Sequence, residues 1–336
     1  MQPDQGPYIV DQNGFRTSTG GIGPLLPLIT AVNYNRSLKE EPPFDWSSVD
    51  IVTDRASLRK LIRWANNKLM FNQKIRKSDK LFRLDLQLAG KKTLLINRVS
   101  LKYAEEHTYR TYREGFRKAA MVAAPGCRNA MEHHRIVTYV GDDNWLRNVL
   151  MLHQDMNGLK MVVQFEVDAY DSGTSNSDQS EELAASLQAT TIQSPTSVQM
   201  NGLTIQKAGQ EVPQTGLLEL GTRWTQNRFQ MDWSEVYTQL FLSQVPKHIV
   251  ASQDNGIFTK IEERMLDADP ELEAAKADAQ TRMKKLVKVL DRIRELFMKE
   301  GKNSRLSLVC VYGTLRVYGR KSPESCLPHD LLELFK

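Results

Sequence analysis

Hydrophobic residues in several stretches recur every three or four positions, the spacing that lines one side of a helix. This pattern predicts helices over residues 54–69, with Asp54 as the N-cap, over 233–243 and over 270–299, and a further helix is expected over about 105–122. The helix at 270–299 is long and charged, and its one apolar stripe favours packing on a sheet over a coiled coil. That stripe consists of Leu272, Ala275, Ala279, Met283, Leu286, Leu290, Ile293 and Leu296.

Elsewhere hydrophobic and polar residues alternate, which predicts half-buried strands. The alternation at residues 82–88 is followed by a Gly90-Lys91-Lys92 turn and an apolar run at 93–96, so a hairpin is expected there. Because strands and helices follow each other without a regular βαβ repeat, we expect an α+β fold of mixed sheets with flanking helices. The remaining strands are expected at 135–140, 159–169, 247–252 before the Asn255-Gly256 turn, and 306–311 with 315–318 as a second hairpin.

Two segments show neither the helical spacing nor the strand alternation of hydrophobic residues. Residues 1–44, with many Gly, Pro, Asn and Gln residues, are expected to form an irregular N-terminal arm. Residues 171–215 are mostly polar and cannot bury enough apolar surface to offset the entropy of ordering, so we expect a disordered insertion. Acidic strands on both sides of this insertion belong to one candidate site, and residues 45–336 are therefore expected to form a single domain.

Composition narrows the class of protein only loosely. The 336 residues are 40% hydrophobic and carry a formal net charge of +5, a mild bias that suits an anionic partner. The three cysteines are widely spaced and odd in number, which argues against a disulfide framework and for a reducing compartment. The longest apolar stretch, residues 25–32, is too short to span a bilayer. We expect a soluble protein of the nucleus or cytoplasm without a membrane or disulfide partner.

Acidic residues gather on two of the expected strands. Glu166 and Asp168 lie two positions apart and therefore on the same side of one strand, and Glu219 lies on a second short β-rich run, residues 218–222. Three carboxylates form an oxygen ligand set for Mg²⁺ or Mn²⁺, and their mutual repulsion calls for a cation. Judged on these residues alone, solvated charges on an open sheet face are the better interpretation.

The order of these motifs changes that judgement. Glu-x-Asp at 166–168, Glu-Leu-x-Thr at 219–222, a helix with Trp233, and residues 245–251 followed by Gly256-Ile257-Phe258 resemble the DXO family. Its members are decapping enzymes and 5′-to-3′ exoribonucleases with a PD-(D/E)XK-like core. The chain is similar to a divergent fungal branch often labelled geranylgeranyl pyrophosphate synthetase. The sequence does not support that label, because Gly141-Asp142-Asp143-Asn144 is not a complete Asp-Asp-x-x-Asp motif and has no second copy.

The resemblance implies roles for individual residues. Glu166 and Asp168 match the metal-binding Glu-x-Asp pair, and Glu219 matches the acid of a Glu-x-Lys motif. Two positions depart from the family: Gly221 replaces the lysine, and Arg117 stands where a glutamate is expected. We therefore expect a degenerate nuclease site in which Arg117 pairs with the acids in place of a metal. Glu114 as the missing acid, or Arg223, Lys118 or Lys160 as the missing cation, are the alternatives.

A basic stretch runs from Arg55 to Arg83 with Trp64 and Phe71 interleaved, as in proteins that follow a phosphate backbone. A solvated helix face is the plainer interpretation. Three functions remain open: a degenerate RNA 5′-end-binding or regulatory protein without a cofactor, an active Mg²⁺- or Mn²⁺-dependent RNA 5′-end decapping exoribonuclease, and a protein-interaction module without nucleic acid. The candidate RNA-binding residues are Arg59, Arg63, Lys74, Arg76, Lys77 and Arg223.

Overall fold

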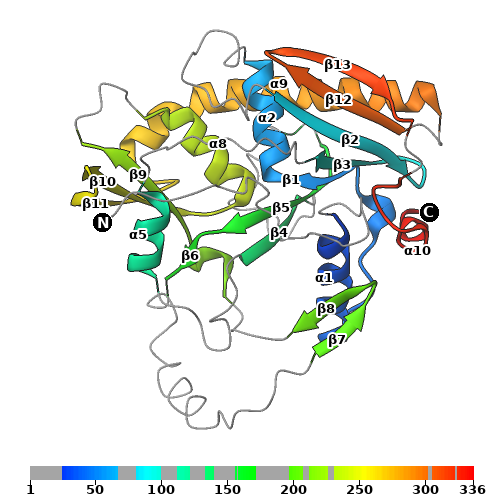
Figure 1. The fold of residues 1–336 in the computed structure, drawn as a ribbon, viewed down its shortest axis with the longest axis horizontal. Coiled ribbons are helices and arrows are strands. Elements are labelled where there is room, and N and C mark those ends of the chain that lie inside the picture. Colours follow the sequence, from blue (N-terminus) through cyan, green and yellow to red (C-terminus); the bar gives the residue numbers. More distant parts are fainter. Residues whose placement is uncertain are drawn as a thin grey trace.

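A large mixed sheet, with strands from both ends of the chain, forms one part of the fold (Figure 1). The computed structural model describes residues 25–66, 81–99, 112–121, 133–139, 156, 158–171, 197–206, 212–225, 231–301, 305–321 and 324–336. Within these residues the large sheet has seven strands. Their spatial order is β13 (Thr314–Gly319), β12 (Arg305–Val311), β2 (Leu81–Ala89), β3 (Thr93–Val99), β1 (Ile51–Asp54), β5 (Met161–Val167) and β4 (His133–Tyr139). The strands β3, β1 and β5 are parallel, and the other pairs are antiparallel.

A smaller sheet adjoins the end of β5. Its described strands are β11 (Ile257–Met265), β10 (Lys247–Asp254), β9 (Leu217–Trp224) and β6 (Ala169–Tyr170), in that order. Only Asp168 separates β5 of the large sheet from β6 of the small one. Because Ala169 pairs with Leu218 in antiparallel register, Asp168 and Glu219 are the next residues along their two strands. The two acidic motifs of the sequence therefore meet where the sheets join.

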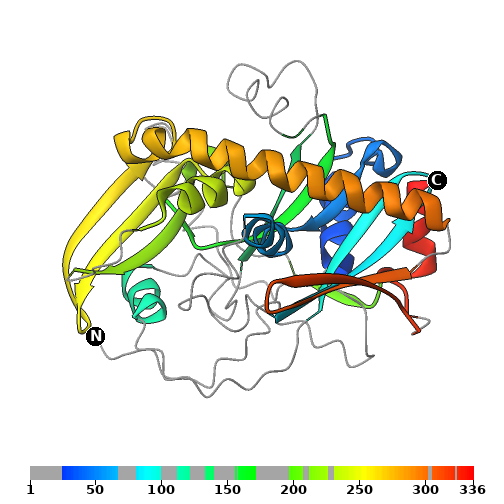
Figure 2. The ribbon, with the colours of Figure 1, turned by 90° about the horizontal axis from the view of Figure 1, so that it is seen from above.

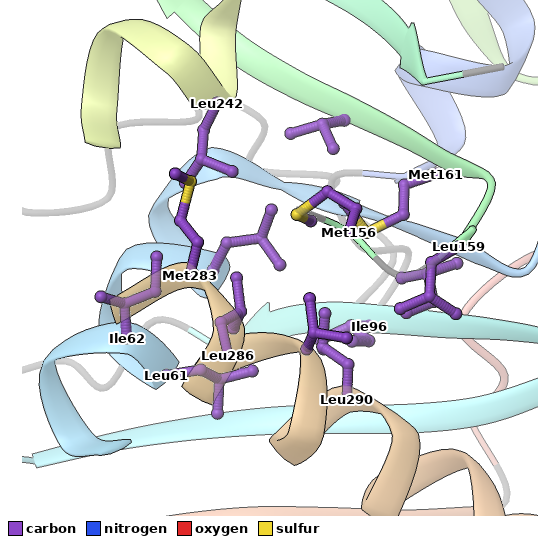
Figure 3. Packing of buried hydrophobic residues seen from close by; sticks show 14 of the residues in the cluster. Leu61, Ile62, Ile96, Met156, Leu159, Met161, Leu242, Met283, Leu286 and Leu290 are labelled. Atoms are coloured by element: carbon purple, nitrogen blue, oxygen red, sulfur yellow. The ribbon is translucent and has the colours of Figure 1, made fainter. Parts of the chain in front are cut away.

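Three helices cover one face of the large sheet: α2 (Arg55–Ala65), α8 (Trp233–Ser243) and α9 (Pro270–Glu300). Each begins at an aspartate N-cap whose side chain accepts backbone N–H groups, namely Asp54, Asp232 and Asp269. Figure 2 shows α9 running along both sheets. The core beneath these helices joins them to the sheet strands (Figure 3). It includes Leu61, Ile62, Ile96, Met161, Leu242, Met283, Leu286 and Leu290.

Helix α1 (Leu25–Leu38) and the C-terminal turns cover part of the opposite face. Leu25 and Leu28 of α1, Val52 of β1 and Phe335 belong to a second buried cluster. The C-terminal elements are α10 (His329–Leu332) and η4 (Glu333–Phe335), and η1 (Trp46–Ser48) lies beside them. On the small sheet, α5 (Arg113–Ala120) packs through Phe116, which belongs to a buried cluster of its own.

Most predicted elements are confirmed, and so is the mixed α/β class. The irregular N-terminal arm is wrong for residues 25–38, which form α1 because its leucines find an apolar partner surface; Pro27 lies in the first turn, where a helix tolerates it. The disordered insertion is wrong for residues 197–206, where β7 (Ser197–Met200) and β8 (Leu203–Gln206) form a hairpin around an Asn201-Gly202 turn with positive φ at both residues. Residues 1–24, 172–196 and 207–211 lie outside the described part.

The described cysteines, Cys310 and Cys326, are both buried and free. Burial raises the pKa of the Cys326 thiol to about 12. No helix among the described residues is long and apolar enough to cross a membrane.

Candidate functional site at the junction of the sheets

Arg117 of α5 reaches the acidic pair at the sheet junction. One of its terminal nitrogens lies 3.2 Å from Glu166 Oε1 and 3.3 Å from Asp168 Oδ1. The helix is held over this point by Phe116, which stacks on Phe258 of β11 with ring centroids 5.0 Å apart. The predicted pairing of Arg117 with Glu166 and Asp168 is therefore present.

Asp168 is the most deeply buried member of this pair. Its side chain is 3% exposed, against 26% for Glu166 and 12% for Arg117. Its second oxygen, Oδ2, accepts a hydrogen bond from the backbone N–H of Leu220 at 2.8 Å. A buried carboxylate requires such partners, because leaving water without them costs several kcal/mol. Arg117 and the β9 backbone together supply them.

Glu219 has a different arginine. Its Oε2 accepts a hydrogen bond from Arg55 Nη1 at 2.8 Å, and its Oε1 accepts one from the side-chain amide of Gln239 on α8. Arg55 also donates to Ser243 Oγ at 2.7 Å and to the backbone carbonyl of Glu166 at 3.4 Å. The three acids are thus divided between two guanidinium groups, and Arg55 links the two halves. We call Arg55, Arg117, Glu166, Asp168 and Glu219 the junction site.

Gly221 lies directly beneath His248 of β10. A Cβ atom on Gly221 would come within 2.7 Å of His248 Nε2, closer than real Cβ contacts. His248 is buried, and it pairs with Glu219 in the parallel register of β9 and β10. The space where a lysine side chain would leave the strand is therefore filled by an imidazole ring. This explains in steric terms why glycine stands at this position.

As they lie, these residues do not fit a divalent metal ion. The carboxylates of Glu166 and Asp168 face Arg117, and that of Glu219 is held by Arg55 and Gln239. Across the described ranges, no three carboxylate, thiol or imidazole side chains lie close enough together to hold a metal. Metal binding by Glu166, Asp168 and Glu219 stays a prediction, and it requires both arginines to move away.

Comparison with known protein families identifies the family of this chain. The family model described as "Domain of unknown function (DUF8563)" matches residues 1–335. The chain belongs to the DUF8563 family. No curated protein matches this DUF8563 chain.

Solved structures show what the DUF8563 fold resembles. Candida albicans Rai1, in complex with pU5 and Mn²⁺, has a TM-score of 0.52 at 13% identity, covering 92% of this chain and 79% of Rai1. Scheffersomyces stipitis Rai1 gives 0.52 at 14% identity, with the same coverage of 92% and 79%. K. lactis Dxo1, in complex with manganese, gives 0.50 at 8% identity, covering 95% of this chain and 75% of Dxo1. The likeness confirms the DXO-type fold; the fungal branch stays a prediction.

The predicted RNA-binding arginines of this DUF8563 protein are engaged by acids. Arg59 Nη2 and Arg63 Nε each lie 2.9 Å from Glu235 Oε1, which connects α2 to α8. Burial alone would raise the pKa of the Glu235 carboxyl, but Arg63 and Arg59 outweigh it and lower that pKa to about 2. Burial and the nearby Arg63 also lower the pKa of the Arg59 guanidinium. We call Arg59, Arg63 and Glu235 the α2–α8 cluster.

The other candidate cations lie in several places. Arg223 is on the same side of β9 as Glu219 and Gly221, where it bonds Ser252 Oγ at 2.9 Å and pairs with Glu262. Lys160 precedes β5 and lies about 20 Å from Glu166 along the strand, so it is wrong as a replacement for the missing cation. Lys74, Arg76 and Lys77 lie outside the described residues, as do the side chains of Glu114 and Lys118.

Three members of this region were missing from the predicted site: Arg55, Gln239 and His248. Arg55 did carry a signal, because a cation in the first turn of a helix is unfavourable beside the helix dipole and calls for an acidic partner. Its partner Glu219 lies 164 positions away, which no local pattern reveals.

Proposed function

We propose that this protein binds RNA 5′ ends at the junction site as a degenerate, regulatory relative of the DXO-type nucleases. The observation that carries the proposal is the contact of Arg117 with both Glu166 and Asp168. A guanidinium fixed between two carboxylates takes the place of the cation that such a cluster requires, and arginine does not lose its charge at accessible pH.

The two arginines also lower the repulsion between the site and an RNA phosphate. Three bare carboxylates would exclude a phosphate unless a metal were bound. With Arg117 and Arg55 beside them, only one negative charge remains uncompensated within the junction site. In this proposal the phosphates are held by Arg59, Arg63, Lys74, Arg76, Lys77 and Arg223, and the protein acts in the nucleus or cytoplasm.

Loss of the lysine argues for weak or absent hydrolysis. Glycine at position 221 has no group with which to orient water or stabilise a developing negative charge, and removing one such group costs roughly a hundredfold to a thousandfold in rate. The buried ring of His248 stands where a side chain at position 221 would begin.

An active metal-dependent enzyme is the second candidate, and the fold shared with manganese-bound Dxo1 favours it. In that case Glu166, Asp168 and Glu219 would hold Mg²⁺ or Mn²⁺ after both arginines turn away. An interaction module without nucleic acid is the third candidate. It is favoured by Ile257 and Ile261 on the edge strand β11, which are 69% and 63% exposed.

Calorimetric titration with Mn²⁺ tests the proposal, combined with incubation of 5′-monophosphate, triphosphate and incompletely capped RNA. We expect no Mn²⁺ uptake and no turnover by the natural protein, and salt-sensitive RNA binding. Arg117→Glu is expected to create Mn²⁺ binding, with Arg292→Glu at an exposed position of α9 as the charge-matched control. Turnover that Asp168→Ala abolishes would establish the enzyme instead. Absence of RNA binding at low salt would leave the interaction module.

A further inference from the structure

A row of side chains crosses the large sheet on the face where Glu166 lies. Within β5, Glu166 points to the same side as Val162, which is buried with Leu95 of β3. Val99 lies four positions after Leu95 and so on that same side. The row continues from Val99 to Arg83, because these two residues lie opposite each other on β3 and β2 and therefore on the same face.

The same row reaches the far edge of the sheet. Arg83 pairs with Val309 of β12, and Val309 pairs with Arg316 of β13. Tyr318 lies two positions after Arg316 and therefore on the same face. The strands β5, β1, β3 and β12 run in one direction, so this row lies at their carboxyl ends, the same end of the sheet as Glu166. The row therefore lies on the same face and at the same end of the large sheet as Glu166 of the junction site.

These positions are open to solvent at the edge. Arg316 and Tyr318 are exposed, Tyr318 at 47%, while Arg83 and Val309 are partly exposed. Val311 at the end of β12 adds an apolar side chain that is 49% exposed. An aromatic ring beside apolar side chains on an open sheet face is the kind of surface on which nucleic-acid bases stack.

The row is also positively charged. Arg316 forms no ion pair within the described part of the chain. Arg83 bonds both oxygens of Asp85 at 2.7 and 3.0 Å, but Arg320 shares that carboxylate at 3.5 Å. Two arginines therefore share one acid and Arg316 has no ion pair among the described residues, a balance that favours an anionic ligand.

We propose that Arg83, Val309, Arg316 and Tyr318 form a platform that binds the body of a single-stranded RNA whose 5′ end occupies the junction site. The inference rests on the proposed function. From β5 to β13 there are five strand spacings, or about 24 Å. At the stacked rise of about 3.4 Å per nucleotide, roughly seven nucleotides span that distance. Arg316 and Tyr318 on β13 therefore act only on strands longer than this.

Fluorescence anisotropy with labelled oligouridylates of five and twelve nucleotides, each with a 5′-phosphate or a 5′-hydroxyl, tests the platform. Tyr318→Ala should weaken binding of the longer strand about tenfold through lost stacking. Arg316→Gln should reduce the slope of log affinity against log salt by about 0.7 for that strand. Both changes should leave the shorter strand within twofold of the natural protein. The matched controls are Val317→Ala, on the opposite face of β13, and Arg292→Gln on α9.

The 5′-end chemistry separates this inference from the proposed function. Platform variants should weaken phosphate- and hydroxyl-ended long strands equally, and a preference for the 5′-phosphate that survives supports both ideas. If Tyr318→Ala and Arg316→Gln change the long strand by less than twofold, the platform is overturned while end recognition stands. If the variants act but the natural protein ignores the 5′ end, the platform stands and the junction-site proposal fails. Dissociation of a dimer by these variants, with RNA affinity unchanged, would make the face a contact between two copies and overturn the platform.

Discussion

The junction site and the α2–α8 cluster both join guanidinium and carboxylate groups, but the acids outnumber the arginines in the first and the arginines outnumber the acid in the second. At the junction, Arg117 serves two carboxylates; between α2 and α8, Glu235 serves two guanidinium groups. One arrangement leaves a surplus of negative charge and the other a surplus of positive charge. Both keep each partly buried charge within reach of an opposite one, as buried charges require. For an RNA phosphate the difference matters: the α2–α8 cluster attracts it, whereas the junction, with one uncompensated negative charge, needs the cations around it to hold a 5′ end.

The largest effect is expected from Arg117→Ala. Removing the guanidinium leaves the buried carboxylate of Asp168 without its charged partner, which should lower the free energy of unfolding by about 3 kcal/mol. Urea denaturation measures this change. Arg292→Ala, which removes an exposed pair with Glu295, should stay within about 0.5 kcal/mol. Adding Asp168→Asn to Arg117→Ala should recover part of the loss; a decrease below about 1 kcal/mol in the single variant would show that the pair does not stabilise the junction.

The α2–α8 cluster should produce a pH dependence. The lowered pKa of Glu235 means that its stabilisation is complete above about pH 4.5 and is lost as the pH falls toward about 2. Because the side chain is partly exposed, we expect roughly 2 kcal/mol. Glu235→Gln should lose that amount at pH 7. Its unfolding free energy should also fall less steeply than that of the natural protein between pH 4.5 and 2.5. Parallel pH profiles for the two proteins would contradict the assignment.

Gly221→Ala tests the steric side of the junction. The added Cβ must displace the buried His248 ring, at a cost of about 1 to 3 kcal/mol. The thermal melting temperature should fall accordingly. His248→Ala should absorb most of this cost, so the two changes should couple in a double-mutant cycle. Strictly additive effects would mean that the ring does not fill this space.

The smallest effect is expected from Arg63→Gln on RNA binding. Since Arg63 and Arg59 share Glu235, only part of one positive charge is available to a phosphate. The salt slope of RNA binding should therefore fall by less than about 0.7. A larger decrease would show that Glu235 releases its arginines when RNA binds. The difference in net charge available to RNA between the α2–α8 cluster and the junction site would then be larger in the complex than in the free protein.

The spacing of hydrophobic residues was sufficient to predict an element when the start signal and the apolar stripe lie within that element. Helix α8 matches its predicted bounds, and α9 extends the predicted helix by one residue, because an aspartate N-cap and an apolar stripe mark both. The strand β11 was missed beyond its turn, since its outward side chains include Ile261 as well as Glu263 and do not alternate in polarity with the inner face. Helix α1 was missed because its sequence shows no clear helical spacing; its apolar side chains are buried by distant segments that a local pattern does not reveal.

The residues of the site also separate into those that the sequence predicted and those that it did not. Glu166, Asp168 and Arg117 could be found because their spacing resembles a known motif order. The partners of Arg55, Gln239 and His248 could not, because each reaches β9 from a separate segment of the chain: His248 through the register of β9 and β10, and Arg55 and Gln239 from helices α2 and α8. Motif spacing reports residues that lie close in the sequence, whereas contacts between distant segments depend on how the fold packs them.

Helix α9 gives the molecule a mechanical property as well. Its 31 residues extend about 46 Å. Near its start Leu272 is buried, and Arg264 of the small sheet bonds its N-cap Asp269, whereas Phe297 is buried near its other end. A rigid rod anchored at both ends transmits force from one sheet to the other. Pulling the two sheets apart in an optical trap should therefore give one rupture event, with the rod and both sheets yielding together.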